Sequence, residues 1–288
     1  MQAKKELEKD REDLLSMKEM TQTYEDVAVA KMQEIRAAVL STREFLSGVE
    51  EIYKLAKAAY LAQVLAIPNK KERQKEIDYI HKNQKTAVVL ISGNHSLLGG
   101  VIFQTYKVFL QLINKVDCDK VVCGTIGRYL AAGARPRFDF SYFPLEDFEV
   151  KDSEIKPIVD LVTKYEKVFL VYPRFQSVLV QVPQIEDISG GITAEESLAG
   201  KKRYMFEPSA KEVMTYFEGQ IIGILFKQKQ LESMLAKYSS RLTVMDEATQ
   251  TIEKYIKQNA LAAVIAGRRA SNKKMLNSFS GVSLWEGK

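Results

Sequence analysis

Two stretches of the chain carry apolar residues at helical spacing over unusual lengths. In the first, apolar or small residues recur every three or four positions, at Leu14, Met17, Tyr24, Ala28, Ile35, Ala38, Phe45, Val49, Ile52, Ala56 and Ala59. In the second, the same rhythm runs from Phe217 to Ile256, with Gln228 and Thr249 at its two polar positions. A stripe that repeats every ~3.5 residues is typical of helices paired in a left-handed coiled coil. Both stretches therefore predict long helices.

The distribution of proline supports this prediction. All seven prolines lie between Pro68 and Pro208, and a proline inside a helix costs about 3 kcal/mol. The flanking segments are rich in residues that favour helix. We therefore expect a first long helix in residues 1–67, a globular domain in 68–202, and a short strand leading into a second long helix in 203–288. The insertion can return the chain antiparallel, which favours an intrachain helix pair, although pairing between two copies stays open.

The middle of the chain has a different pattern. β-branched and aromatic runs alternate there with helical periodicity, which is typical of a mostly parallel sheet covered by helices. Expected strands are 86–92, 120–126, a short one around residues 138–140, 167–175 and 177–185, and expected helices are 101–113 and 154–167. The predicted fold is thus an antiparallel coiled coil of terminal helices with a Rossmann-like, mostly parallel α/β domain inserted between them.

Composition narrows the class of protein. Of the 288 residues, 46% are hydrophobic and 27% are charged, and the sequence has no apolar run long enough to span a membrane. The first residues mix acids and bases, which matches neither a signal nor a transit peptide and predicts a cytosolic or cytosol-facing protein. Net charge is +5, and residues 254–288 carry seven Lys or Arg against one acid. That end is either a solvated face or a contact for an acidic partner.

Candidate chemistry is sparse. Residues 92–100, SGNHSLLGG, follow a predicted strand and open a predicted helix, where backbone amides can bind phosphate. They match neither common phosphate-binding motif, and no Lys follows the glycines, so a tight turn is favoured over a nucleotide site. His95 has no nucleophile or acid at a recognisable spacing. Cys118 and Cys123 fit no zinc pattern with the two histidines and are interpreted as unpaired thiols. We expect no catalytic residue, metal or cofactor.

Four segments resemble one known family. Residues 203–214, RYMFEPSAKEVM, and 237–256, KYSSRLTVMDEATQTIEKYI, are similar to the last shaft helix of the gamma subunit of F-type ATP synthase and to the entry into that helix. VVLISGNHSLLGG resembles the family's first strand and glycine turn, and residues 35–59 resemble its first shaft helix. The family's K-I-T-x-A-M signature is absent, and the last residues follow its pattern loosely. Residues 1–34 are interpreted as an N-terminal extension that prolongs the first helix toward the basic end.

The resemblance implies a non-catalytic rotor. The paired helices would stand inside the hexamer of alpha and beta subunits, and the α/β domain would lie beside the membrane c-ring and an epsilon or delta subunit. The resemblance places Arg268 and Arg269 at acidic loops of beta, and Tyr204 and Glu207 at the foot near the ring and epsilon. It also implies that Leu242, Met245, Ile252 and Ile52 pack the shaft. No contact with nucleic acid is expected.

The same resemblance implies a peripheral membrane protein on the cytoplasmic face that couples proton or sodium flow to ATP synthesis or hydrolysis. Two alternatives stay open. One is a coiled-coil scaffold whose α/β domain binds a nucleotide or effector through residues 92–100, and the other is a gamma-like subunit of a repurposed rotary ATPase.

Overall fold

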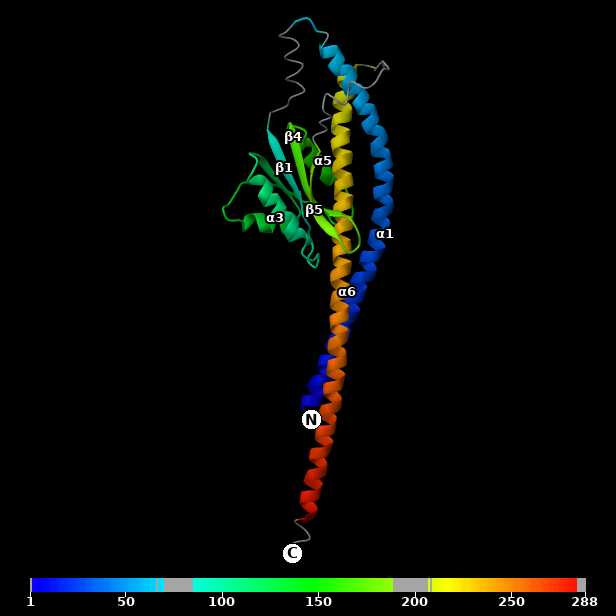
Figure 1. Cartoon of the computed structure of the whole chain (residues 1–288), viewed down its shortest axis with the longest axis vertical. Coiled ribbons are helices and arrows are strands. Elements are labelled where there is room, and N and C mark those ends of the chain that lie inside the picture. The colour runs from blue at the N-terminus through cyan, green and yellow to red at the C-terminus, as the bar shows by residue number, and fades with distance from the viewer. Residues whose placement is uncertain (1, 66, 70–84, 189–206, 208, 284–288) are drawn as a thin grey trace. The chain divides into compact units, whose positions relative to one another are not determined.

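Two long helices contain nearly half of the chain's residues. The computed structural model describes residues 2–65, 67–69, 85–188, 207 and 209–283. Helix α1 runs over Gln2–Leu65 and helix α6 over Ala210–Ser283, each without a break (Figure 1). The prediction of two proline-free terminal helices is confirmed. The expected strand at the entry to the second helix lies outside the described residues.

A five-stranded sheet lies between these helices in the sequence. Its strands are β1 (Thr86–Ile91), β2 (Asp119–Cys123), β3 (Ser141–Phe143), β4 (Lys167–Phe175) and β5 (Gln181–Asp187). The spatial order is β3-β2-β1-β4-β5, with β1 to β4 parallel and β5 antiparallel to β4. The predicted mostly parallel α/β fold between long terminal helices is therefore confirmed.

Helices cover both faces of the sheet, which is why β1 is an uninterrupted aliphatic run. On one face, Val88 and Leu90 pack in a cluster with Phe109 of α3 (Val101–Ile113). On the other face, Val89 and Ile91 belong to a cluster that contains residues of α5 (Asp152–Val162) and α6. The α6 members of that cluster are Ile222 and Phe226. The long C-terminal helix is thus part of the core of the α/β domain.

The chain divides into two compact units. One comprises residues 29–240, and the other comprises residues 1–28 together with 241–288. Within the first unit, Val49, Ala56 and Tyr60 of α1 cluster with Ile221 of α6. Because the end of α1 thereby meets the beginning of α6, the two helices pair antiparallel within one chain.

The second unit also pairs α1 with α6. The hydroxyl of Thr249 lies 2.8 Å from that of Thr21 and donates to Glu25 Oε1 at 2.6 Å. Lys18 Nζ lies 2.7 Å from Glu253 Oε1. The first residues of the chain therefore continue α1 alongside the C-terminal part of α6, as the expectation for residues 1–34 required.

The buried stripe of α1 differs from the stripe predicted from sequence. Phe45 and Ile52 are 62% and 45% exposed, so Ile52 lies beside the packed seam rather than in it. Among the α1 side chains that the structure describes, the buried apolar ones are Ala28, Ile35, Val39, Leu46, Val49, Ala56, Tyr60 and Val64. Apolar residues also stand next to the buried positions, as Phe45 does beside Leu46. The spacing of apolar residues alone does not show which residue of such a pair is buried.

Part of α6 is buried on all sides and not along a single stripe. Every residue from Gln228 to Ser240 is buried, including the charged side chains of Lys229, Glu232 and Lys237. We call residues 228–240 the buried segment. It contacts α1 on one side, where Ser239 Oγ donates to Met32 Sδ at 3.6 Å, and the sheet domain on another, where Ser240 Oγ donates to the carbonyl of Leu98 at 2.8 Å.

Candidate functional site

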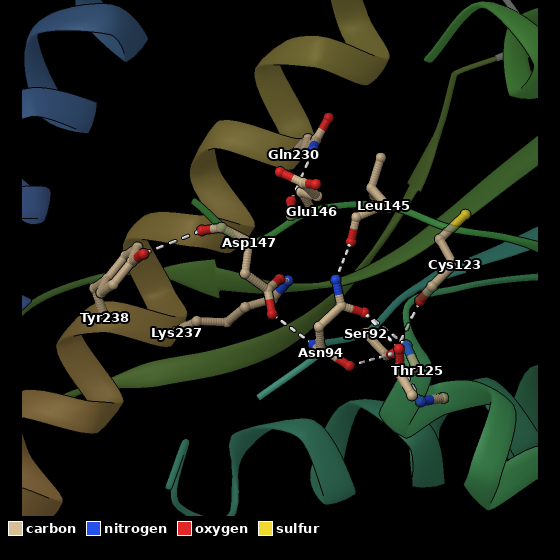
Figure 2. Close-up of polar contacts among 12 residues, drawn as sticks. Ser92, Asn94, Cys123, Thr125, Leu145, Glu146, Asp147, Gln230, Lys237 and Tyr238 are labelled. Carbon is tan, nitrogen blue, oxygen red and sulfur yellow. Dashed lines mark hydrogen bonds and ion pairs between the residues drawn. The ribbon is translucent and has the colours of Figure 1, made fainter. Parts of the chain in front are cut away.

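The segments that follow three parallel strands converge at the carboxyl edge of the sheet. Asn94 follows β1, Thr125 follows β2 and Asp147 follows β3. The Asn94 side chain donates to the carbonyl of Leu145 at 2.6 Å and accepts from the amide and hydroxyl of Thr125 at 2.8 and 3.0 Å (Figure 2). In open α/β sheets this edge is the usual place for a ligand. Here the polar side chains of the loops bind one another.

Helix α6 contributes a cation to the same place. Lys237 Nζ lies 2.7 Å from Asp147 Oδ1, while Asp147 Oδ2 accepts the backbone N–H of Asn94 (Figure 2). The hydroxyl of Tyr238 donates to the backbone carbonyl of Asp147 at 3.2 Å. Lys237 and Asp147 are 3% and 7% exposed. We call Asn94, Asp147, Lys237 and Tyr238 the polar junction.

The electrostatics of the junction favour an ionised Asp147. Burial alone would raise the pKa of this carboxyl, but the Lys237 ammonium, the Asn94 amide and His95 together lower the pKa below its ordinary value. Removing one partner of such a buried pair leaves an uncompensated charge, which costs about 3–5 kcal/mol. The junction therefore fixes α6 to the loops of the sheet through a contact that is costly to break.

A second polar group joins α6 to the strands. The buried hydroxyl of Tyr172 on β4 lies 2.8 Å from Glu186 Oε2 on β5 and 3.2 Å from Glu232 Oε2 on α6. Lys229 Nζ lies 2.9 Å from Glu186 Oε1. Burial and the two carboxylates raise the pKa of Tyr172, which keeps its phenol protonated as a donor. We call Tyr172, Glu186, Lys229 and Glu232 the carboxylate cluster.

The turn at residues 92–100 is held by contacts within the chain. A Cβ on Gly93 would lie 2.7 Å from Leu98 Cδ1, and Gly99 has a φ of 59°, so both positions suit glycine. The ring of His95 lies 4.8 Å from that of Phe148. With the side chain of Asn94 also engaged inside the chain, the structure matches the tight turn that the sequence favoured rather than a phosphate cradle.

The cysteines are separate thiols. Cys118 directly precedes β2 and Cys123 is its last residue, and both are free and buried. Burial raises the pKa of the Cys123 thiol to about 12, and Lys237 opposes that shift only in part. Among the described residues, no cluster of His, Cys, Asp and Glu is suited to a metal ion. In the same residues, no helix is long and apolar enough to cross a membrane.

The residues singled out by the sequence lie in several places. Arg268 and Arg269 are exposed on α6, in the unit that contains residues 241–288. Met245 and Ile252 are buried in that unit, and Leu242 is half-buried. Glu207 is exposed.

Tyr204 lies outside the described residues. Neither the polar junction nor the carboxylate cluster was expected from sequence. The signal that could have indicated the polar junction is the stretch SMLAKYSSRL, where small and apolar residues surround Lys237 in the helix.

Comparison with known proteins identifies the family. The model of the family described as ATP synthase matches residues 4–265 of the chain. The ATP synthase gamma chain of Pelotomaculum thermopropionicum is 26% identical over 281 residues, covering 94% of this chain and 95% of that protein.

The chain belongs to the ATP synthase gamma-subunit family. Solved structures share its fold. The central stalk and c-ring structure of the Tetrahymena thermophila mitochondrial ATP synthase has a chain with a TM-score of 0.55 and 16% identity, covering 80% of this chain and 99% of that one. The rotor of the Euglena gracilis mitochondrial ATP synthase gives a TM-score of 0.56 and 12% identity, with 94% and 98% covered. Members of the gamma family are non-catalytic stalk subunits.

The family match corrects one expectation. Residues 1–34 were interpreted as an addition to the family's length, but the family model begins at residue 4. The gamma chain of Pelotomaculum thermopropionicum also aligns over nearly the full length of both proteins. The first residues of α1 therefore belong to the ordinary length of the family. The error arose because the first helix carries few distinctive motifs, so its start was set too late.

Proposed function

We propose that this protein is the rotor subunit of an ion-translocating ATP synthase, and that it couples ion flow at the membrane ring to ATP chemistry in a hexamer of alpha and beta subunits. The observation that carries the proposal is the gamma-family match over residues 4–265. A rotor must act through contacts that differ between the states of its partners, because a ligand shifts an equilibrium only by its differential affinity.

The proposed partners are the alpha and beta subunits, an epsilon or delta subunit and the membrane c-ring. In this arrangement the protein is peripheral to the cytoplasmic face of the membrane through the complex. The rotor structures of other organisms that share its fold support the proposal. Whether the ion is a proton or sodium, and which direction of the reaction prevails, are properties of the assembled enzyme.

Affinity purification tests this proposal. A tagged chain expressed in its own cells should recover alpha, beta, epsilon or delta, and c subunits from detergent-solubilised membranes. The purified chain alone should hydrolyse no ATP. Recovery of the chain without any of these subunits would overturn the proposal.

We further propose that Arg268 and Arg269 contact acidic loops of the beta subunits. Both side chains are exposed on α6, and the planar guanidinium group of arginine can bind a carboxylate through two parallel hydrogen bonds. The variant Arg268→Gln/Arg269→Gln should assemble normally but lower the ATPase rate of the complex. Lys273→Gln/Lys274→Gln is the matched control, because it removes another exposed basic pair five residues further along α6. Equal rates in the two double variants would refute a specific contact.

Glu207 and Tyr204 are proposed contacts for the ring and the epsilon subunit. Glu207 is exposed just before α6 begins, which leaves its carboxylate available to a partner. Glu207→Gln should reduce the amount of epsilon that co-purifies with the chain, whereas Glu212→Gln, an exposed acid in the first turn of α6, should not. Unchanged recovery of epsilon would leave Glu207 with a local role in the entry to the helix.

A further inference from the structure

The charges of the buried segment call for a role beyond stability. Lys229 and Glu232 are each 8% exposed and Lys237 is 3% exposed, and charged side chains are almost never buried unless they are paired. Replacing a buried ion pair by neutral or apolar residues is often neutral or stabilising. A helix that needed only to adhere to the sheet could therefore do so with contacts such as those of Ile222 and Phe226.

These charged side chains attach α6 to the sheet domain at two positions along the helix axis. The carboxylate cluster holds it to β4 and β5 through Lys229 and Glu232. The polar junction holds it to the loop that contains Asp147 through Lys237 and Tyr238. Lys237 lies eight positions after Lys229, which is about 12 Å along a helix axis. Two attachments at different positions along the axis oppose both rotation of the helix about its axis and sliding along it.

Directional contacts differ from apolar packing in what they resist. The hydrophobic effect is non-directional and roughly proportional to the buried apolar area, so it fixes the angle of a helix less sharply than contacts that need a defined geometry. The Lys237–Asp147 pair and the Tyr172–Glu232 hydrogen bond have a defined geometry and lie away from water, where an unsatisfied group is costly. Turning α6 against the sheet would break both contacts together.

We propose that the polar junction and the carboxylate cluster form a rotational lock, through which the α/β domain transmits torque to α6. This inference rests on the proposed rotor function. Lys237 and Glu232 are then positioning residues, because they keep the angle between the helix and the sheet domain fixed while the rotor works against a load. The helix that they hold continues without a break to Ser283.

The decisive variant removes the charges without leaving one unpaired. In Lys237→Met/Asp147→Asn, the amide oxygen can still accept the backbone N–H of Asn94, and Met retains the apolar stem of the lysine. The matched control is Lys227→Met. Lys227 Nζ lies 3.0 Å from Asp152 Oδ1, so this pair joins the same helix to the sheet domain, but at an exposed position. A second test variant, Tyr172→Phe/Glu232→Gln, weakens the carboxylate cluster with smaller changes and serves if the first fails to fold.

The measurement compares ATP hydrolysis with ion pumping in membrane vesicles that contain the assembled complex, at increasing opposing ion gradients. Assembly is verified first by co-purification with alpha, beta and c subunits. With both test variants we expect hydrolysis to continue while pumping is lost as the gradient rises. The parent protein and Lys227→Met should keep the two activities in proportion. Thermal unfolding of the isolated chains should show that Lys237→Met/Asp147→Asn folds with nearly parental stability.

The possible outcomes distinguish a failure of the rotational lock from a failure of the proposed rotor function. If the parent chain does not assemble with ATPase subunits, the rotor function fails and the lock fails with it. If the variants assemble and pumping stays proportional to hydrolysis at every gradient, the lock alone is wrong. A parallel fall of both activities at zero gradient would also contradict it, because a purely structural defect has that signature.

Discussion

The backbone N–H of Gly127 in α4 (Thr125–Ala132) donates to Ser92 Oγ at 2.8 Å, so the start of this helix rests directly on the end of β1. The same hydroxyl donates to the carbonyl of Cys123 at 2.8 Å (Figure 2). One buried serine thus ties the ends of β1 and β2 to the helix between β2 and β3. The close approach depends on the missing side chain of Gly127.

Gly127→Ala should therefore destabilise the protein. The new Cβ would lie 2.6 Å from Ser92 Oγ and 2.9 Å from Val122 Cγ1, and overpacking of this kind costs about 1–3 kcal/mol. Urea denaturation followed by circular dichroism would measure the loss. Gly223→Ala is the control, since its Cβ would meet Val159 Cγ2 at 4.0 Å. That change should stabilise α6 by up to about 1 kcal/mol.

Breaking the Lys237–Asp147 pair on one side should be far more harmful than removing both charges. Lys237→Met leaves a buried carboxylate without its cation, and we expect a loss of about 3–5 kcal/mol in the free energy of unfolding. Lys237→Met/Asp147→Asn should recover most of that loss. The double-mutant cycle, completed with Asp147→Asn, gives the coupling energy directly. Additive effects of the two changes would show that the pair has no net coupling.

Acid should weaken the fold partly through Asp147. Its pKa is lowered in the folded protein, so its contribution to stability is complete above the unfolded value, which is about 3.9. The contribution is lost as the pH falls further through the lowered folded value. Stability measured from pH 6 down to about pH 3 should thus decline less steeply in Asp147→Asn than in the parent protein. Identical slopes would mean that this carboxyl is not selectively stabilised in its ionised form.

Cys123 should be inert in the folded protein. Burial raises the pKa of its thiol to about 12, and the thiolate is the form that reacts with alkylating reagents. Iodoacetamide at pH 8 should label Cys123 after denaturation but not before, with peptide mass spectrometry as the readout. Rapid labelling of the native chain would show that the end of β2 opens readily.

The sequence located secondary-structure elements best where the apolar residues follow one regular pattern. The aliphatic run of β1 and the helical spacing of Val101–Ile113 were both located correctly, because each element has one clear period. Helix α4 was missed, since it is short and follows the strand with a single glycine between them. Strand β5 was expected at 177–185 but covers Gln181–Asp187, because Ser177 and Val180 form a tight turn after β4.

The candidate site was harder to anticipate, because its members are polar residues in loops and in a helix. A lysine in a helix is normally read as solvated, and only tertiary structure shows that Lys237 points at a carboxylate from a distant loop. Arg268 and Arg269 were singled out by resemblance alone, and their exposure on α6 is consistent with a partner contact without testing it. Positions buried between partners cannot be inferred from the periodicity of a single chain.

The place of Ile222 and Phe226 in the core of the sheet has a consequence for biosynthesis. These residues follow all five strands in the chain, so a sheet emerging from the ribosome has one face that lacks part of its cover. Asp147 meanwhile has no Lys237 to pair with, and its carboxylate stays hydrated. Nascent domains with exposed apolar surface are prone to aggregate. Completion of the α/β domain must therefore wait for translation of the C-terminal helix, which gives chaperones a defined interval in which to bind.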